Sequence, residues 1–488
     1  MTELQHAAKA TRPRIQPAEE GDRRPLSVSA RLGRLQFHQS GKFRVLQFAD
    51  IQDGPKVSKD TISLIEASLD ATRPDLVIFN GNQIAGYDSA YALTSRKRRW
   101  DARPASASSE ASGERYAAAL EHTRELVRAT IEQLVHPLAD RGVPWAVTFG
   151  NHDFQCGLDN DEIESICREF PGCINPERAA DGTTGIAVKH GVKHDVGDME
   201  QDFGLPEQPV IACAPGTFAL SVTDVDRTYD VLGLVLLDSG DYARSGGYGS
   251  PSEAALRFLA DAPGLMAAQS QQLQQDRQDD EQDSPREPRK TPSTLPCMVF
   301  QHFPIEQYYR LLKPVAATAA RAIEGYRNFA GRHFVLNEDK TQPGSYLGEG
   351  VSCPDADSSE FAILDKAGYF AISAGHDHRN AFVGSVPVGT DGDRQMMMVA
   401  SPTSGFGSYG PVPAKRAARL FEFDIRHPYE PRTQLLEYDE LVGKPSAGKA
   451  YAYGMTSESK PDSEGMDLLH RPTWWSKTWN KLVSLFRR

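Results

Sequence analysis

Five short apolar runs of this sequence end in side chains that can bind a cation or move a proton. These side chains are aspartate, amide or imidazole groups, and each follows its apolar run within a few positions. They are Asp50, Gln52, Asn82, Asn151, His152, His302, His376 and His378. Oxygen and imidazole donors of this kind suit manganese, iron or zinc. The pattern therefore predicts a metal site built at the ends of strands.

The apolar runs are themselves typical of buried strands. They occur at 43–50, 74–82, 144–153, 230–241, 296–304, 369–378 and 394–405, with nearly continuous Val, Ile, Leu and Phe. Helical periodicity lies between several of them, as at 58–74 and 114–140. This alternation predicts an α/β fold with much parallel pairing. Because the carboxyl ends of such strands open onto one crevice, we expect the polar side chains to converge there.

The order of the motifs is the strongest signal. The sequence reads GNHD at 150–153, QHFP at 301–304 and GHDH at 375–378. With the earlier Asp50, this series resembles the calcineurin-like metallophosphoesterase superfamily. The stretches SGDY (239–242), GHDHRNAF (375–382) and SGFGSYG (404–410) resemble its purple-acid-phosphatase-like branch. The resemblance implies a four-layer αββα sandwich of two mixed β-sheets flanked by helices, with a two-metal hydrolytic centre.

The resemblance also implies roles for single residues. Asp50 and His378 would bind a first metal, and Asn151, His302 and His376 a second. His152 would stabilise or protonate the leaving-group oxygen, oriented by Asp153. A hydroxide bridging two divalent ions (manganese, iron or zinc) would attack phosphorus.

Two positions depart from the family pattern. Gln52 stands where the family has a metal-binding histidine, and Asn82 stands where it has the aspartate that bridges both metals. An amide has one neutral oxygen that binds a cation and a nitrogen that does not. The first metal should therefore be bound more weakly than the second. Asp53 is either a replacement carboxylate or part of a turn before Gly-Pro, and turn chemistry is favoured.

Two functions follow from these departures. The first is a metal-dependent hydrolase that cleaves a phosphomonoester, with a phosphorylated small molecule or a phosphoprotein as substrate. The alternative is a catalytically impaired phosphoesterase-like binding protein with one metal or none. The two hypotheses differ in how strongly a site with Gln52 and Asn82 would bind cations.

The composition of the chain limits the classes of partner and the cellular location that we expect. The chain has 488 residues, a formal net charge of −12 and a pI of about 5.6. Such an acidic surface argues against broad nucleic-acid binding, which needs a basic face. The N-terminus has no apolar core of a signal peptide, and no apolar run reaches 18 residues. We therefore expect a cytoplasmic protein.

The chain divides into three expected parts. Residues 1–30 are polar and expected to be disordered. Residues 31–430 form the metallophosphoesterase domain, with polar insertions near 96–113 and 268–294. Residues 431–488 form an extension whose end, Trp475 to Phe486, places aromatic and basic side chains as an amphipathic helix would. Peripheral contact with an anionic membrane and docking on the protein's own body both fit this segment.

Overall fold

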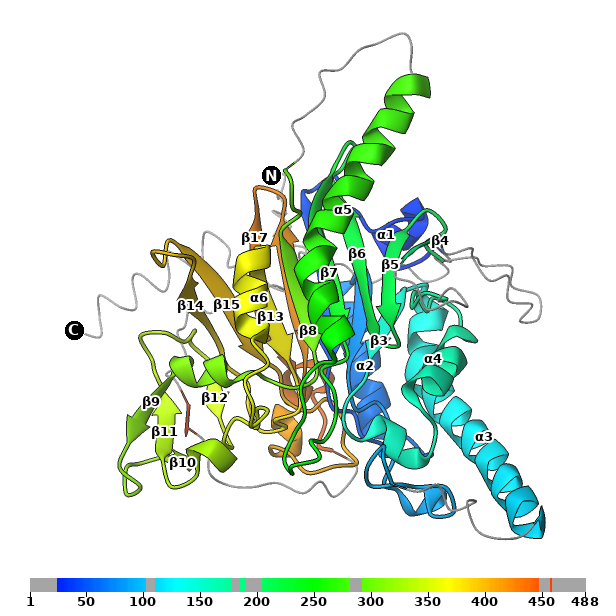
Figure 1. Ribbon diagram of the computed structural model, residues 1–488, viewed down its shortest axis with the longest axis vertical. Helices are drawn as coiled ribbons and strands as arrows, with labels where there is room; N and C mark the ends of the chain where they lie inside the picture. Colours follow the sequence, from blue (N-terminus) through cyan, green and yellow to red (C-terminus); the bar gives the residue numbers. More distant parts are fainter. Residues whose placement is uncertain are drawn as a thin grey trace, which may run out of the picture.

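Two large mixed β-sheets face each other in the computed structural model, which describes residues 24–101, 110–177, 185–188, 204–280, 292–446 and 457–458 (Figure 1). Within these ranges one sheet has five strands, in the order β17 (His427–Glu437), β16 (Ala417–Asp424), β1 (Lys42–Phe48), β2 (Leu76–Asn80) and β3 (Trp145–Thr148). The other has eight, in the order β14 (Val383–Val388), β15 (Arg394–Ala400), β13 (Tyr369–Ala374), β8 (Cys297–Gln301), β7 (Asp230–Leu237), β6 (Thr217–Thr223), β5 (Pro209–Ala214) and β4 (Gly185–Val188).

Helices cover the outer faces of both sheets (Figure 1). They are α1 (Val28–Leu32), α2 (Lys59–Thr72), α3 (Glu110–Arg141), α4 (Asn160–Arg168), α5 (Glu253–Asp280), α6 (Glu360–Ala367) and α7 (Tyr438–Val442). Short 3₁₀ helices lie at η1 (Ser89–Tyr91), η3 (Asp153–Cys156), η4 (Glu306–Leu311), η5 (Arg327–Phe329) and η6 (Pro413–Lys415). A small sheet joins β10 (Ile323–Glu324), β11 (His333–Leu336) and β9 (Leu312–Val315), and β12 (Tyr346–Leu347) pairs with β18 (Ser457–Glu458). No helix in the described part of the chain has the length and apolar character needed to cross a membrane.

Three apolar cores separate the four layers. Between the sheets, Phe300 of β8 meets Phe421 of β16 edge to face, with ring centroids 5.5 Å apart. Leu259 of α5 packs in a second core against the outer face of the eight-stranded sheet. Leu69 of α2 and Leu134 of α3 pack in a third core against the five-stranded sheet. The expected αββα sandwich is confirmed, because each sheet buries apolar side chains on both faces.

Most of the expected elements are present, but three expected boundaries are wrong. All seven apolar runs contain strands. The N-terminal segment is ordered earlier than expected, because Ser27, Ser29 and Ala30 are buried around α1. The helix α3 begins at Glu110, inside the polar insertion expected near 96–113. The boundary at residue 430 divides β17, whose strand pairing continues to Glu437. Polar composition concealed α1, the first turn of α3 and the end of β17, since a short helix, a helix end or an edge strand needs few apolar residues.

The pH dependence of stability should report on Glu360, the first residue of α6. Burial raises the pKa of its carboxyl to about 7, although a hydrogen bond from Gln301 opposes the shift. The folded chain therefore binds this proton more tightly than the unfolded chain, and the stabilisation is lost as pH rises through 7. The wild type should lose free energy of unfolding between pH 5 and pH 8. In Glu360→Gln we expect this loss to be smaller by on the order of 2 kcal/mol.

Urea unfolding at the two pH values measures this effect. The matched control is Glu253→Gln, because Glu253 also begins a helix but is exposed. The control should keep the wild-type pH dependence. An unchanged pH dependence in Glu360→Gln would contradict the assignment.

Candidate metal centre

Five of the expected ligands meet at the carboxyl ends of β1, β2, β3, β8 and β13. The Oδ1 atom of Asp50 lies 3.1 Å from Asn82 Nδ2, 3.4 Å from His378 Nε2 and 3.8 Å from His302 Nε2. The Oδ1 atom of Asn151 lies 3.0 Å from His302 Nε2. All five side chains are buried. We call these residues (Asp50, Asn82, Asn151, His302 and His378) the cluster.

His376 borders the cluster through its ring. The centroid of that ring lies 5.0 Å from that of His302 and 4.4 Å from that of Tyr248. The backbone N–H of His376 donates to Asp50 Oδ2 at 2.7 Å. The structure therefore places His376 beside the cluster, and its main chain orients the Asp50 carboxylate.

Backbone strain marks the same place without reference to any family. Nine non-glycine residues among those described have positive φ, and four of them are expected ligands: Asp50 (51°), Gln52 (44°), Asn82 (54°) and His376 (70°). The left-handed region costs an ordinary residue free energy and persists where the surroundings enforce it, commonly at functional sites.

Two glycines allow the strand ends to approach closely. A Cβ on Gly81, which has φ of +86°, would lie 2.5 Å from His302 Nδ1. A Cβ on Gly150 would lie 2.2 Å from Asn82 Oδ1. A side chain at either position would push a cluster residue away.

The Asn82 side chain is the decisive difference from a two-metal centre. The backbone N–H of His152 donates to Asn82 Oδ1 at 2.9 Å, and this fixes the amide because an N–H can only donate. The Nδ2 amino group therefore faces inward, within 3.0–3.2 Å of Asp50 Oδ1, Asn151 Oδ1 and His302 Nε2. It stands among the ligands as a hydrogen-bond donor, where a bridging aspartate would present an oxygen.

The charge of the cluster rests on Asp50. Burial alone would raise the pKa of its carboxyl, but His302, His378 and His376 hold that pKa well below the usual range. Burial lowers the pKa of His302 and, more strongly, of His376. The pKa of His378 is raised, because the attraction of Asp50 outweighs burial. The cluster thus has one buried negative charge, and His378 is its best partner.

Main-chain carbonyl groups next to the cluster orient the imidazole rings of His302 and His378. His302 Nδ1 faces the carbonyl oxygen of Asn80 at 3.3 Å, and His378 Nδ1 faces that of Tyr409 at 2.7 Å. A carbonyl only accepts, so both Nδ1 atoms carry the proton. The Nε2 atoms then face the cluster, where they can accept a hydrogen bond or bind a cation, as in histidine metal sites with oriented outer partners.

His152 is held by a different residue from the one expected. Its Nδ1 lies 2.7 Å from Gln155 Oε1, and burial lowers its pKa to about 4. Asp153 instead accepts backbone N–H bonds of 2.7–3.2 Å from Asn82, Gln83, Ile84 and Gly150. The expectation that Asp153 orients His152 is wrong, because the carboxylate is turned toward these four donors. Burial raises the Asp153 pKa to about 7 against their lowering effect.

Gln52 and Asp53 both make contacts outside the cluster. Gln52 is buried and its backbone N–H donates to Asn82 O at 2.9 Å, while its side chain makes no hydrogen bond to any residue that the structure describes. Asp53 Oδ2 accepts from Ser58 N at 3.0 Å and Thr61 Oγ1 at 2.7 Å. Asp53 therefore orders the start of α2 and does not replace the missing carboxylate.

The expected ligand list missed a set of tyrosines around the cluster. The Tyr242 hydroxyl accepts from Asn151 Nδ2 at 2.9 Å. The Tyr409 ring stacks on His378, with centroids 4.2 Å apart, and the Tyr87 ring meets His152 edge-on at 4.9 Å. Tyr242 and Tyr409 lie in the stretches SGDY and SGFGSYG, so their motifs carried a signal. The sequence around Tyr87 and Gln155 gave no indication that these residues lie near the cluster.

The residues fit one divalent cation better than a bridged pair. Ligands on one cation at about 2.1 Å lie about 3.0–3.4 Å apart. The 3.0 Å between Asn151 Oδ1 and His302 Nε2, two acceptors, has this spacing. No group of three or more His, Cys, Asp or Glu side chains in the described ranges is arranged to hold a metal, so the set depends on the amide oxygen of Asn151. Residue 82 cannot bridge two cations as an aspartate would, because Asn82 presents its nitrogen to the cluster.

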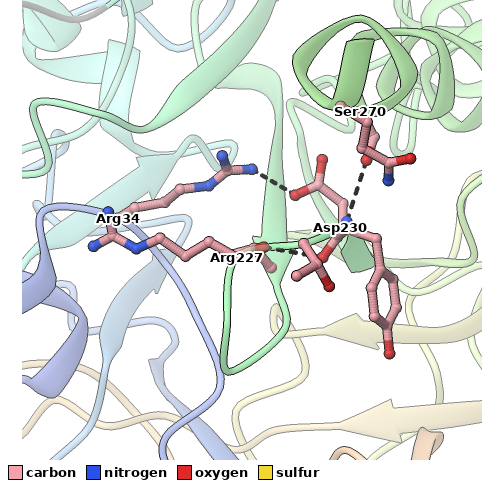
Figure 2. A pocket seen from close by; sticks show the side chains of 8 residues that line it. Arg34, Arg227, Asp230 and Ser270 are labelled. Carbon is pink, nitrogen blue, oxygen red and sulfur yellow. Dashed lines mark hydrogen bonds and ion pairs between the residues drawn. The ribbon is translucent and has the colours of Figure 1, made fainter. Parts of the chain in front are cut away.

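A separate pocket lies between the residues after α1, the turn between β6 and β7, and α5 (Figure 2). Figure 2 shows Arg34 pointing at Asp230, to which it is ion-paired, and Ser270 Oγ accepts from the Asp230 N–H at 3.2 Å. Its volume is about 10 Å³, enough for about one water molecule. It offers no room for a substrate.

Part of the chain matches a known family. Residues 43–211 match the family model "Calcineurin-like phosphoesterase". This segment of the chain is thus similar to calcineurin-like phosphoesterases, the family whose motifs the sequence resembles. This family typically uses divalent metals.

Curated relatives agree with the branch. The chain is 21% identical over 388 residues to Phosphatase DCR2 of Saccharomyces cerevisiae, an alignment covering 74% of this chain and 47% of that protein. It thus spans about half the length of this relative. It is 19% identical over 479 residues to Probable inactive purple acid phosphatase 29 of Arabidopsis thaliana, covering 94% of this chain and 92% of that protein. With Probable inactive purple acid phosphatase 28 of the same plant it shares 22% over 411 residues, covering 80% and 77%.

Proposed function

We propose that this chain is a metal-dependent phosphoesterase that hydrolyses a phosphomonoester, with a phosphoprotein among the candidate substrates. The observation that carries the proposal is the convergence of Asp50 Oδ1, Asn151 Oδ1 and two histidine Nε2 atoms in one buried cluster. The orientation of Asn82 leads us to propose one cation in place of the two that the motifs implied. When bound, a divalent cation polarises the phosphate and makes a nearby water more acidic.

The chain's own residues supply orientation. Asp50 is held by the His376 N–H, and His302 and His378 by main-chain carbonyls. His152 Nε2 lies on the cluster side, 3.3 Å from Asn151 Nδ2, where it would meet the leaving-group oxygen. Gln155 positions that ring through Nδ1. These contacts fix the geometry before a substrate arrives.

A catalytically impaired binding protein is the second candidate. The inward amino group of Asn82 favours it, because this group satisfies the ligands without a cation. Two of the relatives also carry the word "inactive" in their names. Contact of Trp475–Phe486 with a membrane stays a prediction, since that segment lies outside the described residues.

Asp50→Asn separates the two candidates. The change removes the one carboxylate of the cluster but keeps its shape. With Mn²⁺ and 4-nitrophenyl phosphate, the wild type should hydrolyse the ester, and Asp50→Asn should lose on the order of 100-fold or more in rate, as expected for a cation ligand. The control Asp261→Asn makes the same change on the exposed face of α5 and should match the wild type. A wild type that shows no cation-stimulated hydrolysis would favour the binding protein.

A further inference from the structure

The basic segment Arg96–Trp100 follows β2 and lies against the loops around the cluster. Arg96 is ion-paired with Asp159, and Arg99 with Asp241. Arg244 lies over the Trp100 ring, 5.1 Å from its centroid. These three contacts tie the segment to the start of α4 and to the loop after β7.

Arg98 is used differently from its neighbours. Its guanidinium carbon lies 3.7 Å from the centroid of the Tyr242 ring, a close cation–π contact. One guanidinium nitrogen donates to the carbonyl of Lys97 at 3.1 Å. Across the described ranges, Arg98 pairs with no carboxylate, whereas Arg96 and Arg99 each have one. Asp101 Oδ2 accepts from the backbone N–H of Arg98 at 2.8 Å, and the Arg98 charge opposes the burial that raises the pKa of Asp241, so the guanidinium lies near carboxylates without forming an ion pair with either.

Tyr242 connects this charge to the cluster. Its hydroxyl accepts from Asn151 Nδ2, and Asn151 Oδ1 faces His302 Nε2. Its ring also stacks against Tyr248, which packs on His376. A guanidinium lying on the face of Tyr242 is thus one aromatic ring away from the cation ligands.

The need for such a charge follows from Asn82. A phosphomonoester carries up to two negative charges, and a cluster that fits one cation offers it less positive charge than a bridged pair would. A guanidinium matches phosphate because its planar donors can contact two oxygens at once. Asp241 is the ion-pair partner of Arg99, which also lies 3.6 Å from Asp238, so neither carboxylate is paired with Arg98.

We propose that Arg98, stacked on Tyr242, binds the phosphate group of the substrate and supplies positive charge that a second cation would otherwise provide. This assignment rests on the proposed function for the identity of the anion. Arg98 thereby becomes a substrate-binding residue on a segment outside the metallophosphoesterase motifs.

Binding of inorganic phosphate tests the proposal independently of turnover. Isothermal titration of the full-length protein with phosphate, in the presence of Mn²⁺, should give a Kd that rises on the order of tenfold or more in Arg98→Ala. Arg98→Lys keeps the charge but loses the planar fork, and it should recover part of the affinity. With 4-nitrophenyl phosphate, KM should rise more than kcat falls. Thermal unfolding verifies that the variants fold.

The matched control is Arg310→Ala. Arg310 also lies over an aromatic ring, that of Phe361, at 4.9 Å, but on the outer layer formed by α6. It should leave Kd and KM unchanged. Equal losses in both variants, unchanged values in Arg98→Ala, or a wild type that binds no phosphate would each overturn the proposal. A wild type without hydrolysis but with Arg98-dependent phosphate binding would support it while the proposed hydrolysis fails.

Discussion

Asn82→Asp should make the folded state depend on divalent cations and raise phosphoesterase activity. In the wild type the Asn82 amino group donates toward three acceptors of the cluster. An aspartate there would bring a second carboxylate against Asp50 without any donor between them. In EDTA we expect a loss of about 2–4 kcal/mol in the free energy of unfolding, because buried like charges and unsatisfied acceptors are costly. Added Mn²⁺ should restore this stability through binding to the folded state.

The same substitution should change the number of cations bound. A carboxylate can bridge two cations, whereas the amide nitrogen of Asn82 binds none. Metal analysis after dialysis should give about one Mn²⁺ per wild-type chain and about two per Asn82→Asp chain. Hydrolysis of 4-nitrophenyl phosphate should rise by about 10- to 100-fold, which corresponds to about 1.4–2.7 kcal/mol of transition-state stabilisation.

Asn151→Asp is the charge-matched control. It adds the same negative charge to the cluster, but Asn82 contacts both Asp50 and His302, whereas Asn151 contacts His302. Asn151→Asp should increase the affinity for the single cation without creating a site for a second one. Two cations per wild-type chain would contradict our assignment of the Asn82 amide, and so would an Asn82→Asp variant whose stability ignores EDTA.

Asp153→Ala should cause the largest loss of stability among the substitutions considered. The buried carboxylate accepts four backbone N–H bonds from the turns after β2 and β3. Removing it leaves four donors unsatisfied inside the protein, which we expect to cost about 3–5 kcal/mol. The turns carry Asn82, Asn151 and His152, so cation binding should weaken as well. Urea unfolding and Mn²⁺ titration measure the two effects.

Two further variants sharpen this result. Asp153→Asn has almost the same shape, but its amino group would face backbone donors, so it should also be strongly destabilising. Asp224→Ala removes a carboxylate that accepts from Thr228 and Tyr229 in a turn between β6 and β7, away from the cluster. It should lower stability moderately and leave cation affinity unchanged. If Asp153→Asn were as stable as the wild type, the carboxylate would not be organising these turns through its charge.

The predicted elements were reliable where one local pattern decided them. The run at 74–82 became β2 because continuous apolar residues bury well on both sides of a strand, and the run at 369–378 became β13 for the same reason. The convergence of Asp50, His302 and His378 followed from the rule that parallel strand ends meet at one edge. Prediction failed at α1 and β17, which are ordered by contacts with distant segments, such as the Ser29 N–H donating to Asp75.

The amino-acid sequence by itself determined the α/β class with much parallel pairing and the polar residues at the strand ends, because apolar periodicity and motif order are local properties of the chain, and the resemblance carried by those motifs implied the αββα sandwich. It also showed that Asn82 departs from the family. Only the tertiary structure decided what that asparagine does: the backbone N–H of His152 turns its oxygen outward and its nitrogen toward the ligands. The same holds for Asp153, Gln155 and Arg98. Their partners are chosen by hydrogen-bond direction and burial among segments far apart in the chain, which residue type and spacing do not specify.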